Sequence, residues 1–181
     1  MVYVFLADGF EECEALAPVD ILRRGGIEVK TVGVTGKTVS GSHNIPVVSD
    51  ITENEVNITE NDAVILPGGM PGTTNLLNSE AVKAAVLKAS ELKCIIGAIC
   101  AAPSVLGQLG LLNGKKATCF PGFEDKLTGA LVTDAPVVKD GNIITSHGAG
   151  AAYDFGFELL TALTGDKAKT EKLKQNMLYR G

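Results

Sequence analysis

Short apolar runs alternate with helical patterns along most of this chain, and this alternation restricts its fold more than any other feature. Apolar runs bounded by turn residues indicate buried strands, and apolar residues spaced by three and four indicate amphipathic helices. We expect strands at residues 2–6, 27–34, 63–66, 94–99 and 117–120, hairpins at residues 37–49 and 137–145, and helices at residues 14–24, 79–92, 101–110, 151–163 and 167–177. Strands alternating with helices predict a mostly parallel α/β sheet covered on both faces.

The size and charge of the chain exclude several classes of protein. Its 181 residues are enough for one domain, residues 1–181, with a full hydrophobic core. The net charge of −5 provides no basic surface, so no specific binding of nucleic acid is expected. The chain opens on an apolar run, without a basic leader or a long apolar stretch. We therefore expect no secretory signal, no membrane partner and a cytoplasmic location.

The cysteines and histidines do not form a metal-binding pattern. The four cysteines are Cys13, Cys94, Cys100 and Cys119, without a C-x-x-C pair. In a cytoplasmic chain they are expected to be free thiols. The two histidines, His43 and His147, are far apart and no zinc-ligand spacing is present, so no metal is expected. The loop at 148–153 resembles half of a dinucleotide fingerprint, but Tyr153 replaces its third small residue, so no cofactor is expected.

Four polar or glycine-rich features follow predicted strands directly. They are residues 8–14, residues 67–72, Cys100 and residues 146–150. In open parallel sheets the ligand site lies beyond the carboxyl ends of the strands, and those ends meet at one edge. The sequence therefore predicts a site where these four features converge.

Cys100 lies where the predicted strand 94–99 runs into a helix start, with Pro103 in the first helical turn. Small residues, Ala98 and Ala102, flank it, as a tight strand–nucleophile–helix turn requires. A helix start favours negative charge, so we expect the Cys100 thiol to have a lowered pKa. The alternative is that Cys100 is a small buried apolar residue, as most free cysteines are.

Backbone amides near Cys100 could stabilise an oxyanion if this cysteine is a nucleophile. The N–H of Ala101, at the helix start, is one candidate donor. The turn at Gly68 and Gly69 is another, because glycine lets the backbone approach a ligand closely. These positions predict an oxyanion pocket between the helix start and the glycine turn.

The acidic residues after the first predicted strand divide into two groups. Glu11 and Glu12 fit a simple role, which is to complement the dipole of the following helix. Glu14 stands at the start of the apolar face of that helix, so its carboxyl is expected near the pocket. A carboxyl held there has a raised pKa and can donate or accept a proton.

Three further residues have weaker signals. His147 stands between a strand end and a glycine loop, where site residues often collect. Cys13 and Cys119 are expected to be packing residues, although Cys13 is beside the acidic residues and could be a second oxidisable thiol.

Six segments together form a specific pattern: residues 7–14 (ADGFEECE), 18–20 (PVD), 66–69 (LPGG), 98–103 (AICAAP), 139–141 (KDG) and 145–150 (TSHGAG). With them, the chain resembles the ThiJ/PfpI superfamily over essentially its whole length, and within it the branch of YajL and the Parkinson's-associated protein deglycase. The resemblance implies a flavodoxin-like three-layer α/β/α sandwich with a mostly parallel central sheet, and a homodimer. It also implies a reactive Cys100, hydrogen-bonded by a protonated Glu14, with an oxyanion pocket formed by the amides of Gly69 and Ala101.

The chain departs from the pattern of this superfamily at three positions. Where members with a catalytic triad carry a histidine, this chain has Phe120, so a protease mechanism lacks its base and proteolysis is not expected. Two positions at the pocket rim that commonly hold arginine match His43 and His147 here. Because histidine titrates near neutrality, we expect anionic ligands to bind more weakly as the pH rises from 6 to 8.

The resemblance leaves three hypotheses about function. The first is a cysteine-dependent enzyme that acts on small α-oxoaldehydes or glycated substrates through Cys100 and Glu14. Its reactions would be the glyoxalase III conversion of methylglyoxal to lactate, without glutathione, and the removal of glyoxal adducts. The second is an oxidation-responsive chaperone or redox sensor in which Cys100 stops at the sulfinic acid. The third is a binding domain that has lost turnover.

Overall fold

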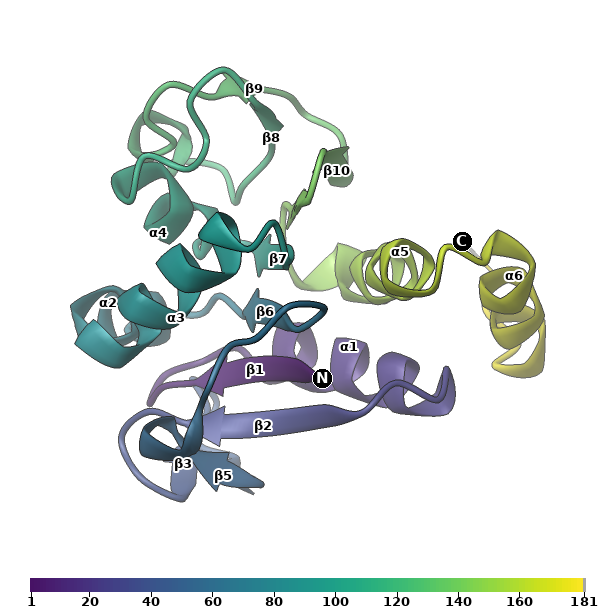
Figure 1. The fold of residues 1–181 in the computed structure, drawn as a ribbon, viewed down its shortest axis with the longest axis horizontal. Helices are drawn as coiled ribbons and strands as arrows, with labels where there is room; N and C mark the ends of the chain where they lie inside the picture. Colours follow the sequence, from purple (N-terminus) through teal and green to yellow (C-terminus); the bar gives the residue numbers. More distant parts are fainter. Residues whose placement is uncertain (181) are drawn as a thin grey trace.

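A seven-stranded sheet forms the centre of the computed structural model, which describes residues 1–180 (Figure 1). Its strand order is β10 (Val137–Asp140), β11 (Ile143–Ser146), β7 (Ile95–Ile99), β6 (Ala63–Leu66), β1 (Val2–Leu6), β2 (Val29–Gly33) and β5 (Ile51–Thr52). Every pairing is parallel except that of β10 with β11, which form an antiparallel hairpin. The predicted mostly parallel α/β sheet is therefore confirmed.

Helices cover both faces of this sheet. One face packs against α1 (Glu12–Arg24) and α5 (Ala152–Thr164), and the other against α2 (Gly72–Asn78), α3 (Glu80–Glu91) and α4 (Pro103–Gln108). The last helix, α6 (Lys167–Asn176), packs beside α5 at the periphery (Figure 1). Among the described residues, no helix is both long and apolar enough to cross a membrane.

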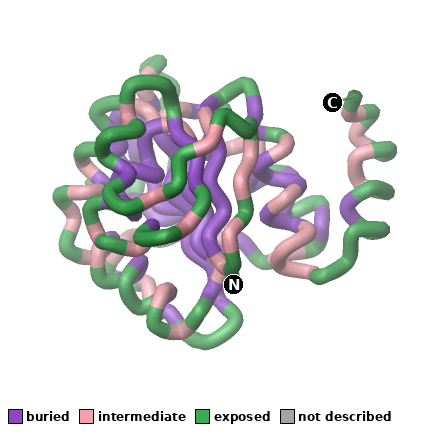
Figure 2. The backbone as a smooth tube through the Cα atoms, turned by 90° about the horizontal axis from the view of Figure 1, so that it is seen from above, coloured by how far each residue is buried: buried purple, intermediate pink, exposed green. Residues whose placement is uncertain are grey.

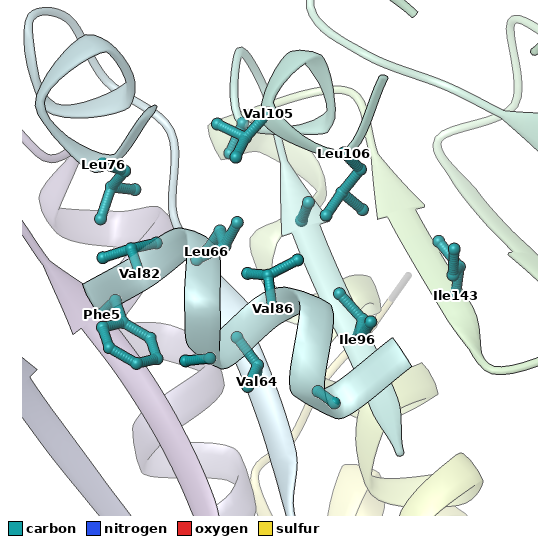
Figure 3. Close-up of a cluster of buried hydrophobic side chains, with 14 of the residues drawn as sticks. Phe5, Val64, Leu66, Leu76, Val82, Val86, Ile96, Val105, Leu106 and Ile143 are labelled. Carbon is teal, nitrogen blue, oxygen red and sulfur yellow. The ribbon is translucent and has the colours of Figure 1, made fainter. Parts of the chain in front are cut away.

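Alternating side chains of the strands build two separate hydrophobic cores. In β1, Phe5 faces the core under α3 and α4, whereas Val4 and Leu6 face the core under α1 and α5. Figure 3 shows the first of these cores, where Val82 and Val86 of α3 pack over the sheet. Burial is concentrated in the central strands, as the purple segments of Figure 2 show. Both cores fix the strand ends, and with them the edge where the predicted site lies.

The structure corrects several predicted element boundaries. The first helix begins two residues earlier than predicted, because the Glu11 carboxylate caps it by accepting the Glu14 N–H at 2.7 Å. The strand predicted at residues 117–120 is shorter, since β8 covers only Lys116–Ala117 and pairs with β9 (Leu131–Val132) outside the central sheet. The predicted hairpin at 37–49 is confirmed as β3 (Thr38–Ser40) and β4 (Pro46–Val48).

Short elements in the connections were not predicted. They are α2, β5, β9 and the 3₁₀ helices η1 (Glu53–Glu55), η2 (Glu124–Lys126) and η3 (Ala149–Ala151). Segments of two to seven residues contain too few positions to show a period, so the sequence pattern carries little signal for them. Two of them matter for the site, because η3 follows β11 and α2 follows the glycine turn after β6.

Candidate active site

Cys100 occupies a sharp turn between β7 and α4, as the sequence predicts. Its φ of +64° lies in the left-handed region, which costs a residue with a side chain about 1–2 kcal/mol. Two hydrogen bonds hold this turn: the Cys100 N–H donates to the Ser146 carbonyl (2.8 Å), and the Cys100 carbonyl accepts the Phe120 N–H (2.8 Å). Neighbouring segments thus impose a strained backbone that holds a partly exposed thiol at the edge of the sheet.

Glu14 lies in the first turn of α1, with only 1% of its surface exposed. Its Oε2 accepts the Gly68 N–H at 3.0 Å, the Ala149 N–H also donates to the carboxyl, and the carboxyl is hydrogen-bonded to the Cys100 thiol. Burial, assisted by the negative charge of Glu11, raises the pKa of Glu14 from 4.5 to about 7 against the lowering effect of its hydrogen bonds. Glu14 is therefore buried, as predicted, and the cause of its raised pKa is the loss of water that the prediction assumed.

The turn at Gly68 and Gly69 brings Cys100 and Glu14 together. A Cβ on Gly68 would lie 2.6 Å from both the Cys100 Cβ and the Glu14 Oε2, so only glycine fits between them. Gly69 has a φ of +88°, and a Cβ there would lie 2.4 Å from the Glu11 nitrogen. The two amides have different partners: that of Gly68 holds Glu14, and that of Gly69 donates to the Cys100 sulfur.

The predicted lowering of the Cys100 pKa is wrong. Burial, the negative charge of Glu14 and the hydrogen bond to Glu14 raise the pKa of the thiol to about 12, although the amides of Gly69 and Ala101 oppose the rise. The following helix, α4, has only six residues, so its dipole does not offset the loss of water around the sulfur. Cys100 is thus a thiol at neutral pH, and it needs an adjacent proton acceptor to become a nucleophile, for which Glu14 is positioned.

Phe120 lies beside the Cys100–Glu14 pair, at the position that matches the histidine of triad-bearing proteins. Its N–H is bonded to the Cys100 carbonyl, and its ring approaches Gly148 closely, 3.4 Å from where a Cβ would lie. The same Cβ would lie 4.0 Å from the Glu14 Oε1, so the ring and the carboxyl flank one glycine. A phenyl ring cannot accept a proton, which leaves Glu14 as the acid–base group in contact with the thiol.

His43 is bound to Glu12 and not to a ligand. The His43 Nδ1 lies 2.8 Å from the Glu12 Oε2, and its N–H donates to the Glu12 Oε1 at 2.8 Å. The hydrogen bond and charge of Glu12 raise the pKa of His43. Glu11, Glu12 and His43 place one possible metal-ligand atom each within 4.8 Å of one another. Both Glu12 oxygens are already occupied by His43, so this trio is explained by its own hydrogen bonds.

His147 follows the end of β11 and lines a cavity to which Cys100 and Glu14 do not contribute. This cavity has a volume of about 150 Å³ and is lined by Cys119, Glu124 and Asp134 in addition to His147. Two carboxylates in one small cavity disfavour an anion, so the structure gives no support to the predicted weakening of anion binding with rising pH. Cys119 is buried, as predicted for a packing residue, and burial raises its pKa to about 11.

Cys13 differs from its prediction, because it is exposed on α1 and does not pack in a core. Its side chain lines a shallow apolar groove with Leu16 and Tyr153. All four cysteines are free thiols in the structure. Cys13 and Cys100 are therefore the two thiols with access to reagents, and experiments on Cys100 must resolve them.

Sequence reasoning missed two groups that hold Glu14. Glu11, assigned only a dipole role, caps the helix through the Glu14 N–H, and the capping spacing of three residues is a signal that could have shown it. The Ala149 N–H donates to the Glu14 carboxyl from η3. A backbone donor carries no side-chain signal, so only the folded chain reveals this contact.

Comparisons with known proteins show the family of this chain. Residues 1–162 match the model of the DJ-1/PfpI family. The Parkinson disease protein 7 homolog of Danio rerio is 38% identical over 167 residues, which cover 90% of this chain and 88% of that protein. A protein named deglycase from Pyrococcus horikoshii is 36% identical over 166 residues, covering 90% and 99%. A solved DJ-1 superfamily protein from Salmonella typhimurium has a TM-score of 0.94 at 38% identity, covering 99% and 98%.

Proposed function

This chain belongs to the DJ-1/PfpI family, and we propose that it is a cysteine-dependent enzyme that acts on small α-oxoaldehydes. The relative named deglycase supports an enzymatic role. The proposed reaction is the glutathione-independent conversion of methylglyoxal to lactate, and the same thiol chemistry would act on glyoxal adducts. The observation that carries the proposal is a buried carboxyl with a pKa of about 7, hydrogen-bonded to the thiol on the strained turn. A general base works best when its pKa is near the working pH.

The first step forms a carbon–sulfur bond. Cys100 adds to the aldehyde carbon of methylglyoxal, and ionised Glu14 accepts the thiol proton as the bond forms. Glu14 then passes this proton to the aldehyde oxygen, so that a neutral hemithioacetal and an ionised Glu14 result. This order suits the raised pKa of Cys100, because the thiolate never has to accumulate in the buried site.

The second step moves a hydrogen between the two carbons of the substrate. Glu14 removes the C1 proton of the hemithioacetal to give an enediolate, the C1 hydroxyl proton passes to the C2 oxygen, and the protonated Glu14 returns its proton to C2. C1 is thereby oxidised and C2 reduced by the same two electrons, and the product is a lactoyl thioester on Cys100. No external oxidant or reductant is needed, which agrees with a mechanism that depends on two side chains only.

The third step releases the product. Water adds to the thioester carbonyl, the carbon–sulfur bond breaks, and the sulfur regains a proton as lactate leaves. The amides of Gly69 and Ala101 interact with the sulfur, so they are the candidate donors for the oxyanion that develops two bonds from it.

Lactate formation from methylglyoxal without glutathione tests the proposal. We expect the Cys100→Ala and Glu14→Gln variants each to lose about 10²-fold or more in kcat, since each lacks one member of the pair. Exposed Cys13 offers a matched control, because Cys13→Ala removes a thiol outside the pair. Full activity of the Cys100→Ala protein would end the proposal.

A second candidate function is a redox sensor, which the amide donors around the sulfur favour. Two equivalents of peroxide would each transfer one oxygen to Cys100 and leave as water, to give the sulfinic acid. The amides of Gly69 and Ala101 and a protonated Glu14 could hold its oxygens. Peptide mass spectrometry after mild peroxide tests this: a gain of two oxygens on Cys100, absent in Cys100→Ser, is expected. Oxidation of Cys13 alone would refute it.

A further inference from the structure

An exposed aromatic ring, that of Phe120, lies beside the Cys100–Glu14 site. Phe120 is anchored to Cys100 by its backbone N–H, and its ring shares the face of Gly148 with the Glu14 carboxyl. The Phe120 side chain is 48% exposed, although it is large and apolar. Because the ring is exposed and lies next to the site, a substrate that reacts at Cys100 can place its substituent against it.

The charges nearest to the site are negative. Glu14 is in contact with the thiol, and the charge of Glu11 acts on Glu14. The two histidines that could have supplied positive charge have other surroundings. His43 is paired with Glu12, and His147 lines the separate cavity with two carboxylates. An anionic group on the substituent of a substrate would therefore meet repulsion from Glu11 and Glu14, with neither histidine placed to pair with it.

From this geometry we infer that Phe120 is a specificity-determining residue, which selects neutral α-oxoaldehydes with an apolar and preferably aromatic substituent over those that carry a carboxylate or phosphate. The inference rests on the proposed function and narrows its substrate class. Aromatic side chains gain from offset or edge-to-face contacts with a second ring, beyond the burial of apolar area. The negative field of Glu11 and Glu14 supplies the discrimination against anions.

Steady-state kinetics with three aldehydes test this specificity. For the unmodified chain we expect kcat/KM to be higher for phenylglyoxal than for methylglyoxal, and higher for phenylglyoxal than for 4-carboxyphenylglyoxal, which carries a carboxylate on the same ring. The Phe120→Ala variant should lower the ratio of phenylglyoxal to methylglyoxal about fivefold, and Phe120→Leu less, because an aliphatic side chain retains part of the contact. An unchanged ratio in Phe120→Ala would overturn the role of this residue. Absence of turnover with all three aldehydes would instead overturn the proposed function.

Alkylation of Cys100 gives a second test that does not depend on turnover. Peptide mass spectrometry separates Cys100 from the exposed Cys13, which serves as an internal control. At Cys100, Phe120→Ala should lower the rate with N-phenylmaleimide relative to N-ethylmaleimide about fivefold, with no change of this ratio at Cys13. A ratio that falls equally at both thiols, or at neither, would show that the Phe120 ring does not recognise the reagent at Cys100.

The charge part of the inference has its own variant. Glu11→Gln keeps a side-chain oxygen that can accept the Glu14 N–H, so the helix cap is retained while the charge is removed. We expect the rate of Cys100 with iodoacetate, relative to iodoacetamide, to rise at least twofold in this variant, which is about the effect of one partly screened charge. Equal ratios in the two proteins would refute the electrostatic selection.

Discussion

Replacing Glu14 with glutamine should stabilise the protein while it abolishes the proposed chemistry. The carboxyl is 1% exposed, and burial raises its pKa from 4.5 to about 7. A folded protein that raises the pKa of an acid favours the protonated form and is destabilised when that acid ionises. Glutamine resembles the protonated carboxyl in shape and charge, with an oxygen for the Gly68 N–H and a donor for the sulfur.

The magnitude follows from the pKa shift. Below pH 4.5 the carboxyl is protonated in both states, so its ionisation costs the folded state nothing. Between 4.5 and about 7 the unfolded chain releases the proton while the folded chain retains it, and stability falls; above 7 the loss is constant. At about 1.4 kcal/mol per pKa unit, the full loss is roughly 3 to 4 kcal/mol, most of which develops between pH 5 and pH 8.

Urea denaturation at pH 5, 6.5 and 8 measures this effect. We expect the free energy of unfolding of Glu14→Gln, relative to the unmodified chain, to increase by roughly 2 to 3 kcal/mol from pH 5 to pH 8. Glu60→Gln is the matched control, because Glu60 is exposed and the same substitution there should show no such trend. Parallel pH profiles for the Glu14→Gln and unmodified proteins would refute the raised pKa, and with it the acid–base role of Glu14.

Three further predictions concern neighbours of the pair. Gly68→Ala should lower kcat/KM about 10²-fold, because the added Cβ would displace Cys100 or Glu14. Gly150→Ala is the control, since a Cβ there meets no atom within 4 Å. Equal activity of the two variants would contradict the close approach at Gly68. Phe120→His should lower the pKa of Cys100 by placing an imidazole beside it. The pH profile of iodoacetamide alkylation should then shift to lower pH, with Phe120→Leu as the control. Coincident profiles would refute the proximity of residue 120 to the thiol. His43→Ala should destabilise the protein more at pH 5.5 than at pH 8.5 in thermal unfolding. The pKa of His43 is raised in the folded state, so its stabilising effect is complete below 6.5 and is lost as the pH rises through the folded pKa; an equal loss at both pH values would count against the Glu12 ion pair.

Local sequence determined most of the strands, the main helices and the position of the Cys100 turn. Apolar runs and helical spacing are local properties, so the fold class followed from them, and the strand 95–99 ended at Cys100 as predicted. Glu14 could be singled out because its position on the apolar face of α1 predicts burial. The glycine pair after β6 was informative for a similar reason, since glycine at a strand end permits close approach.

Tertiary structure decided the pKa values of these residues and the groups that they contact. The pKa of Cys100 depends on burial and on Glu14, which α1 delivers from a distant part of the chain, and a prediction from the adjacent helix alone had the wrong sign. The Gly68 N–H binds Glu14 and the Gly69 N–H interacts with the Cys100 sulfur, and this difference depends on how the turn after β6 is folded. The same is true of His147 and Phe120, because His147 lines a separate cavity, whereas Phe120 is bonded to the Cys100 carbonyl and its ring lies against Gly148. Side-chain direction and loss of water are properties of the packed chain, so no local pattern could specify them.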